Sequence, residues 1–143
     1  MTAQPLLLEI KLLNNLIKRK IDNISTEDSV EAITGMQGFI IGYLSDHIDE
    51  DIFQRDLETR FELRRPTATN ILNTMEKGGL ITREPVSHDA RLKKLTLTDK
   101  AISVHKAFID SILELDRIAI QGLSAEDTER FLETLRVIKK NIE

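Results

Sequence analysis

One side of the segment 66–77 gathers side chains that can hydrogen-bond to bases and phosphates, with no carboxylate among them. If the segment is helical, its apolar residues form one stripe, comprising Ala68, Ile71, Leu72 and Met75. The opposite side carries amides, hydroxyls and a cation: Pro66, Thr67, Thr69, Asn70, Asn73, Thr74 and Lys77. Base edges and phosphates accept these groups. We interpret this side as a surface that contacts nucleic acid; a plain solvated face is the alternative.

The charge distribution permits such a surface. The chain has 143 residues and a net charge of −4, but residues 54–100 carry ten basic and seven acidic side chains. Residues 1–53 are acidic by contrast, with four basic and nine acidic side chains. Phosphates respond to the local potential rather than to the total charge. An acidic protein of this kind can therefore still present one positive face.

The residues on either side of segment 66–77 predict the helices and strands that surround it. A short helix over 54–61 and a second helix over 66–77, separated by 62–65, have the spacing of a helix-turn-helix. Gly78-Gly79 ends the second helix, and strands follow over 80–84 and 95–98. The polar, partly basic segment 85–94 between the strands should project as a hairpin tip. The sequence thus predicts a winged helix-turn-helix.

Apolar helices are expected on both sides of this unit. A stripe through Leu6, Ile10, Leu13, Ile17 and Ile21 predicts an N-terminal helix, with Pro5 in its first turn. Further leucines widen the stripe, so this helix packs either in its own subunit alone or also against a second subunit. Two C-terminal helices are predicted over 101–120 and from the Ser124 cap to Ile142. Their apolar sides comprise Ile102, Phe108, Ile112, Leu115 and Ala119, then Phe131, Leu132, Leu135, Ile138 and Ile142.

A further helix is predicted between the N-terminal helix and the helix-turn-helix. Thr34 and Gln37 have the spacing of a capping box, which would open a helix reaching to about Ser45. Its buried side is expected to comprise Met36, Phe39, Ile40, Tyr43 and Leu44. Gly38 and Gly42 are four residues apart, a spacing that indicates close helix packing.

These pieces resemble the MarR (multiple-antibiotic-resistance regulator) family of winged-helix transcription factors. The matching segments are 65–69 at the start of the recognition helix, 76–80 at its end, Asp89-Ala-Arg91 in the wing and 95–100 after it. The resemblance implies a mainly α fold with a small β-hairpin wing, organised in three regions. Residues 1–33 would form an N-terminal dimerisation region, 34–100 the winged helix-turn-helix domain and 101–143 the C-terminal dimerisation helices.

The resemblance also implies a function. We expect a sequence-specific regulator of transcription, a repressor that binds a pseudo-palindromic operator as a homodimer and leaves it when a small molecule binds. Its partners would be double-stranded DNA, a second copy of the chain and an aromatic or anionic effector, for which Phe39 and Tyr43 are candidate contacts. The alternative is a winged-helix module that binds proteins and has little affinity for DNA.

Carried over position by position, the resemblance implies a set of DNA contacts on the turn, the recognition helix and the wing. They are Arg64, Arg65, Thr67, Thr69, Asn70, Asn73, Lys77, His88, Asp89, Arg91 and Lys93. Arg91, oriented by Asp89, would enter the minor groove. Asn70 stands where many members have arginine, and asparagine can pair bidentately with adenine. Glu62 and Arg64 occupy a turn in which relatives often carry glycine and serine.

Other classes of chemistry lack their usual residues. The chain has no cysteine, which excludes disulfides, thiolate nucleophiles and cysteine-bound metals. His47, His88 and His105 are far apart, and no hydrolase, metalloprotease or nucleotide-binding motif occurs, so we expect no enzyme, cofactor or metal site. The longest uncharged stretch, residues 32–45, is too short to span a membrane. Since the first residues do not resemble a signal peptide, we expect a cytoplasmic protein that does not bind membranes.

Overall fold

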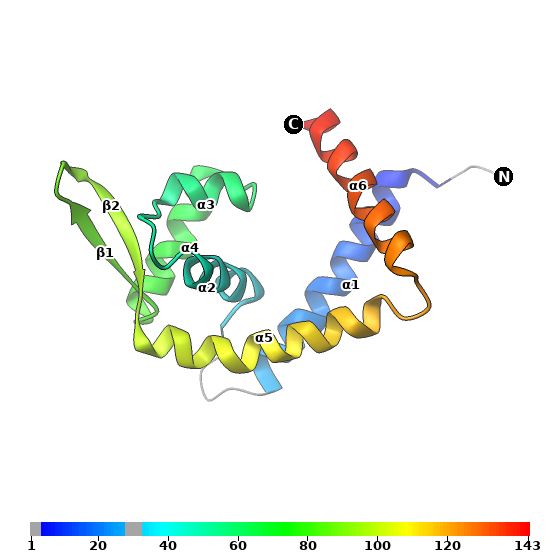
Figure 1. Cartoon of the computed structure of the whole chain (residues 1–143), viewed down its shortest axis with the longest axis horizontal. Coiled ribbons are helices and arrows are strands. Elements are labelled where there is room, and N and C mark those ends of the chain that lie inside the picture. The colour runs from blue at the N-terminus through cyan, green and yellow to red at the C-terminus, as the bar shows by residue number, and fades with distance from the viewer. Residues whose placement is uncertain (1–3, 28–32) are drawn as a thin grey trace. The chain divides into compact units, whose positions relative to one another are not determined.

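The computed structural model describes residues 4–27 and 33–143, which form helices and one β-hairpin (Figure 1). The elements in chain order are α1 (Leu6–Glu27), α2 (Gly35–Asp46), α3 (Gln54–Arg60), α4 (Arg65–Lys77), β1 (Ile81–Val86), β2 (Asp89–Leu97), α5 (Asp99–Ala119) and α6 (Ala125–Ile142). This order confirms the predicted winged helix-turn-helix with flanking helices. Residues 28–32, in the expected 1–33 region, lie outside the described residues.

The chain divides into two compact units, Met1–Ser111 and Ile112–Glu143. The first unit contains α1 to α4, the hairpin and the first part of α5; the second contains the end of α5 and α6. The centre of the first unit's core consists of side chains that are at most 1% exposed. The largest are Ile40, Ile41, Leu57, Leu72, Met75 and Ile81.

The helix-turn-helix is α3 followed by α4. Of the apolar stripe predicted for α4, Ala68, Leu72 and Met75 are buried, and Ile71 is half-buried. The turn contains Glu62 at a φ of 55°, a left-handed conformation that favours glycine. Arg64 is the N-cap of α4 and makes no side-chain capping bond, so this helix begins without the usual hydroxyl or amide cap.

Helix α2 begins with the predicted capping box but is rotated relative to our prediction. Thr34 Oγ1 accepts from the Gln37 amide at 3.2 Å, and Gln37 Oε1 accepts from the Thr34 amide at 3.1 Å. The prediction of the buried side was partly wrong: Ile41 is fully buried, whereas Phe39 is 37% exposed. Because nearly every residue of this helix is apolar, its periodicity does not specify which side faces the core.

Side chains of α5 pack closely against the two glycines of α2. A Cβ on Gly38 would overlap the ring of Phe108, and one on Gly42 would lie 3.2 Å from His105 Nε2. The GxxxG spacing therefore marks close helix packing within one chain, as predicted. Phe108 and Ala101 are the buried residues of α5, whereas Ile102, which we expected on the apolar side, is 49% exposed.

The hairpin is longer than the sequence suggested. Strands β1 and β2 pair antiparallel, with Ile81 opposite Leu97 and Pro85 opposite Lys93. The segment 85–94, expected as a projecting tip, is therefore mostly strand, and only the short connection at 87–88 remains as the tip. The sequence pattern did not reveal the full length of these strands. Most of the hairpin's outer residues face solvent, so apolar and polar side chains need not alternate along them.

The terminal helices keep most of their apolar residues exposed. Ile21 is the buried side chain among the described residues of α1, whereas Leu6, Leu7 and Leu16 are each more than half exposed. In α6, Ser124 forms the predicted cap by accepting from the Asp127 amide at 3.0 Å, but none of this helix's residues is buried. Among the described helices, none combines the length and apolar character needed to cross a membrane.

Candidate nucleic-acid interface

The outward side of α4 is exposed, as the sequence predicted. Arg65, Thr67, Asn70, Asn73 and Lys77 are all exposed, as is Arg64 just before the helix. The apolar stripe on the other side packs into the core. Amides, a hydroxyl and cations are therefore available on one accessible helix face. Glu76, near the end of α4, is also exposed and lies 4.0 Å from Arg83 beside Asn73, so the prediction that this side lacks a carboxylate was wrong. That these residues contact DNA remains a prediction.

Contacts between α3 and α4 fix the beginning of this face. Gln54 Nε2 donates to Thr69 Oγ1 at 2.9 Å and to the Arg65 carbonyl at 3.5 Å. The Arg65 guanidinium lies 3.9 Å from Glu58 of α3, and its side chain is 82% exposed. Thr69 is half-buried, so part of its hydrogen-bonding capacity holds the two helices together. Arg65 can leave its exposed ion pair at little cost, since such pairs contribute about 0–1 kcal/mol.

The wing carries the second group of predicted contacts. Asp89 Oδ1 accepts from the Arg91 amide at 2.9 Å and from Arg91 Nε at 3.3 Å. The backbone amide first, and then the guanidinium, lower the pKa of Asp89, which keeps it ionised. The Arg91 side chain is 92% exposed, so Asp89 orients it without covering it. His88 at the tip and Lys93 on β2 are also exposed.

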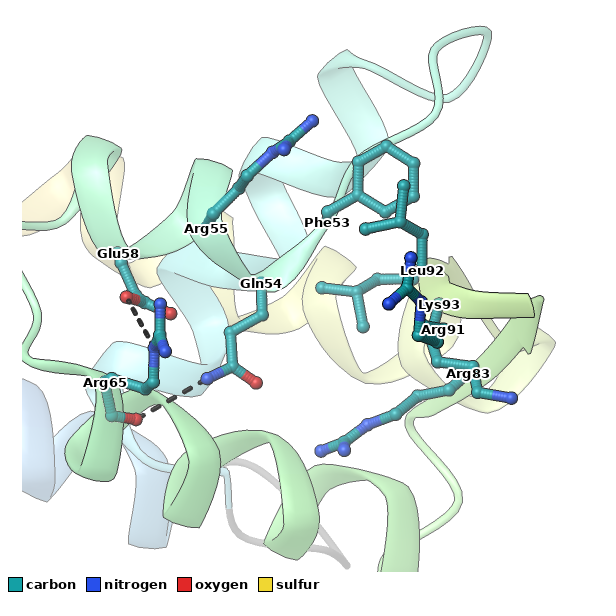
Figure 2. A pocket seen from close by; sticks show the side chains of 10 residues that line it. Phe53, Gln54, Arg55, Glu58, Arg65, Arg83, Arg91, Leu92 and Lys93 are labelled. Carbon is teal, nitrogen blue, oxygen red and sulfur yellow. Dashed lines mark hydrogen bonds and ion pairs between the residues drawn. The ribbon is translucent and has the colours of Figure 1, made fainter. Parts of the chain in front are cut away.

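A cleft of about 440 Å³ joins the two groups (Figure 2). Arg65, Glu58 and Gln54 lie along one side of it, and Arg83, Arg91 and Lys93 along the other. Five of its lining side chains are cationic and one is anionic; the cations are Arg55, Arg65, Arg83, Arg91 and Lys93. The structure thus brings the start of α4 and the wing onto one positive surface, which can hold phosphates by charge and by hydrogen bonds.

Sequence reasoning missed three residues of this surface: Gln54, Arg55 and Arg83. Arg83 Nη2 donates to Asn73 Oδ1 at 2.9 Å, and its Nε lies 4.0 Å from Glu76. A signal for Arg83 was present, because strand alternation places it on the same side of β1 as the buried Ile81. Gln54 and Arg55 follow no comparable pattern.

A second cleft, of about 580 Å³, lies between α1 and α2. Its walls include Ile17, Ile21, Met36 and Phe39, and Lys18 and Asp22 add one charge of each sign. Phe39, a candidate effector contact, lines this cleft. The other candidate, Tyr43, is not part of its lining.

Tyr43 instead makes ring contacts with neighbouring elements. Its ring lies 4.1 Å from the His47 ring and 6.0 Å, edge to face, from Phe61. These contacts give Tyr43 a packing role beside α3. In the described parts of the chain, no group of three or more histidine or acidic residues could hold a metal ion.

Known proteins are similar to this chain in the region of the helix-turn-helix and the wing. The family model described as "MarR family" matches residues 33–92, which include both helices of the helix-turn-helix and most of the wing. Over this segment the chain is similar to the MarR family. This confirms the resemblance noted from segments 65–69, 76–80 and 89–91.

Solved MarR-family structures are similar over nearly the whole chain. MepR of S. aureus, in a crystal structure of its DNA complex, is 25% identical with a TM-score of 0.86, covering 99% of this chain and 100% of MepR. The transcription regulator MarR from Oenococcus oeni is 28% identical with a TM-score of 0.80, covering 95% and 99%. The heme sensor protein PefR from Streptococcus agalactiae, in complex with heme, is 27% identical with a TM-score of 0.67, covering 97% and 95%.

Proposed function

We propose that this protein is a sequence-specific DNA-binding regulator of transcription that acts as a homodimer and represses from a pseudo-palindromic operator. The observation that carries the proposal is the positive cleft that joins the start of α4 to the wing, next to the exposed outward side of α4. The α4 side chains would contact base edges in the major groove, and Arg91 would contact the minor groove beside it. The similarity to MepR, a protein crystallised with DNA, supports the same use of this surface.

The apolar side chains that the terminal helices leave exposed support the homodimer. In α1 they include Leu6, Leu7 and Leu16, and in α6 Phe131 and Leu132. Large contiguous apolar surfaces usually mark an interface. A two-fold dimer presents two recognition helices, which would meet two half-sites about one turn of DNA apart.

Release by a small molecule is the third part of the proposal. The cleft between α1 and α2 has the size of ordinary ligand pockets, which is about 300–1,000 Å³. Ile17, Met36 and Phe39 would contact an aromatic ring, and Lys18 would pair with an acidic group. A ligand there would favour one spacing of the two recognition helices over another. The PefR structure contains heme, so one similar protein does bind an aromatic, anionic molecule.

The DNA-binding part is tested by selecting duplexes from a random pool and measuring their affinity by fluorescence anisotropy over a range of salt concentrations. We expect one palindromic motif to be enriched and affinity to fall with salt. The log–log slope should be about −0.9 for each phosphate neutralised. Arg91→Ala should weaken binding to all sequences and make the slope shallower. Lys140→Ala, an exposed cation on α6, is the matched control and should change neither.

Two outcomes contradict the proposal. No enriched duplex at low salt would favour the protein-binding module. An unchanged slope for Arg91→Ala would show that the wing does not touch DNA. The same anisotropy measurement with added aromatic acids tests the effector: release that is weakened by Lys18→Ala supports the α1–α2 cleft, and release unaffected by it does not.

A further inference from the structure

Asn73, on the outward side of α4, is held by a residue of the wing. Arg83 Nη2 on β1 donates a hydrogen bond of 2.9 Å to Asn73 Oδ1. Glu76, three residues further along the same side of α4, lies 4.0 Å from Arg83 Nε. The Arg83 side chain is only 23% exposed, whereas Asn73 is exposed. The contact therefore anchors an exposed amide to a mostly covered guanidinium.

The chemistry of this contact determines which way the amide points. A guanidinium has only donors, so the atom of Asn73 that meets it must be the carbonyl oxygen. A free carboxamide can rotate and offer either its oxygen or its nitrogen to a ligand. In Asn73 one lone pair of the oxygen is engaged by a positive charge, which fixes the orientation of the amide and leaves the NH₂ group as its free donor.

We propose that Arg83 is a positioning residue that sets the base preference of Asn73. With Arg83 in place, Asn73 acts as a donor towards acceptors of the major groove, namely guanine O6 or N7 and thymine O4. Bidentate pairing with adenine requires the carbonyl oxygen to accept from the adenine N6 amino group at the same time. Arg83 disfavours that pairing, because the Asn73 oxygen would have to accept from the guanidinium and from adenine N6 at once. This inference rests on the DNA-binding function proposed above.

Asn70 provides an internal comparison. It lies three residues before Asn73 on the same exposed side of α4. Within residues 4–27 and 33–143, no hydrogen bond of the Asn70 side chain is found, so its amide can rotate and pair bidentately with adenine. Two asparagines on one helix face would then select different bases, because the wing constrains only one of them.

A direct phosphate contact is the competing role for Arg83, since it lines the cleft with Arg65, Arg91 and Lys93. The two roles differ in what they change. A phosphate contact strengthens binding to every sequence and steepens the salt dependence. A positioning residue changes which base is preferred at one base pair of the operator, and it has this effect only in a protein that contains Asn73.

The experiment measures binding of the full-length protein to its selected operator and to duplexes that differ at the base pair affected by Asn73→Ala. The variants are Asn73→Ala, Arg83→Met, the double variant and Glu84→Gln. Glu84 is the matched control, because it is the next residue on β1 and lies on the opposite side of the hairpin. Wild-type protein should favour guanine or thymine over adenine at that position by roughly 5- to 100-fold.

Arg83→Met should reduce that preference at least about 5-fold by letting Asn73 accept from adenine. In the Asn73→Ala background, the same change should leave the base preference as it is. The inference is overturned if Arg83→Met lowers affinity equally for all duplexes with a shallower salt slope. It is also overturned if the change in preference persists without Asn73.

Asn73→Asp tests the inference without altering the wing. The carboxylate can still accept from Arg83 but has no donor, so the preference should move from guanine and thymine towards cytosine, whose N4 amino group donates. An unchanged preference in this variant would refute the donor role of Asn73. If wild-type protein enriches no duplex at all, the proposed function fails, a result distinct from these.

Discussion

Helices α4 and α6 both carry an apolar stripe at helical spacing, but only α4 buries it within the chain. In α4, Leu72 is 1% exposed and Met75 is fully buried. In α6, Phe131 is 51% and Leu132 41% exposed, and no residue of the helix is buried. Similar patterns therefore lead to different environments. Periodicity shows that a helix has an apolar side, but not whether the surface that covers it belongs to the same chain.

The difference separates two sources of stability. The winged region has a core of its own, so its packing should not depend on a second subunit. The terminal helices lack such a core, and under the proposed function they depend on the dimer. Substitutions in the terminal helices should therefore weaken the dimer, whereas substitutions in the core of the winged region should destabilise each subunit by itself.

The largest effect is expected for Phe131→Glu on α6. Covering a phenylalanine contributes about 1.5–3 kcal/mol, and a symmetric dimer contains the residue twice. A loss of roughly 3–6 kcal/mol would raise the dimer dissociation constant about 150- to 20,000-fold. Sedimentation velocity measures this change, with Glu133→Gln, an exposed change on the same helix, as the control. A dimer of unchanged affinity would show that α6 is not part of the interface.

Leu72→Ala is the corresponding substitution in the core of the winged region. Removing a fully buried leucine side chain costs about 2–5 kcal/mol, because a cavity remains. Denaturant unfolding should show this loss at every protein concentration, whereas the loss for Phe131→Glu should disappear once the wild-type protein is also monomeric. A Leu72→Ala effect that varied with concentration would mean that the winged region, too, depends on the second subunit.

Gly38→Ala tests the packing of α2 against α5. The added methyl group would overlap the Phe108 ring, and overpacking of this kind costs about 1–3 kcal/mol. Gly42→Ala is the graded control, since its Cβ would lie 3.2 Å from His105 Nε2 and needs a smaller adjustment. Thermal unfolding should therefore rank Gly38→Ala below Gly42→Ala. The opposite order would contradict the close approach at Gly38.

The elements of the winged region could be predicted because local chemistry specifies them. Thr34 and Gln37 fixed the start of α2 by capping, and Gly79, at a φ of 75°, ends α4 in a conformation that glycine adopts without strain. The outward side of α4 was predictable because Leu72 and its neighbours occupy the other side. In each case the signal lies within one or two turns of chain.

Features that depend on distant partners could not be predicted in this way. The Asn73–Arg83 contact joins residues ten positions apart in different elements, and it depends on how β1 lies against α4. The burial of Ile41 in place of Phe39 depends on the angle at which α2 meets the core. Strand alternation could have suggested Arg83, but no local pattern identifies its partner.

The smallest effect concerns His105, where α5 meets α2. Burial lowers the pKa of His105, while the charge of Asp46 acts in the opposite direction. Its Nε2 is buried without a hydrogen-bond partner among the described residues. As the pH falls below about 6.5, the unfolded chain therefore takes up a proton before the folded one does. Folding stability should decline with falling pH until the lowered pKa is passed, and then level off.

Unfolding midpoints measured between pH 7.5 and 5 should show this decline in wild-type protein and a flatter profile in His105→Gln. His88→Gln, at the exposed wing tip, is the control for the loss of a histidine away from the α2–α5 contact. Because His105 contacts Gly42, the decline should also become weaker if the α2–α5 packing is loosened by Gly38→Ala. An equal pH dependence in all three variants would place its source in other groups and leave the α2–α5 contact without an electrostatic role.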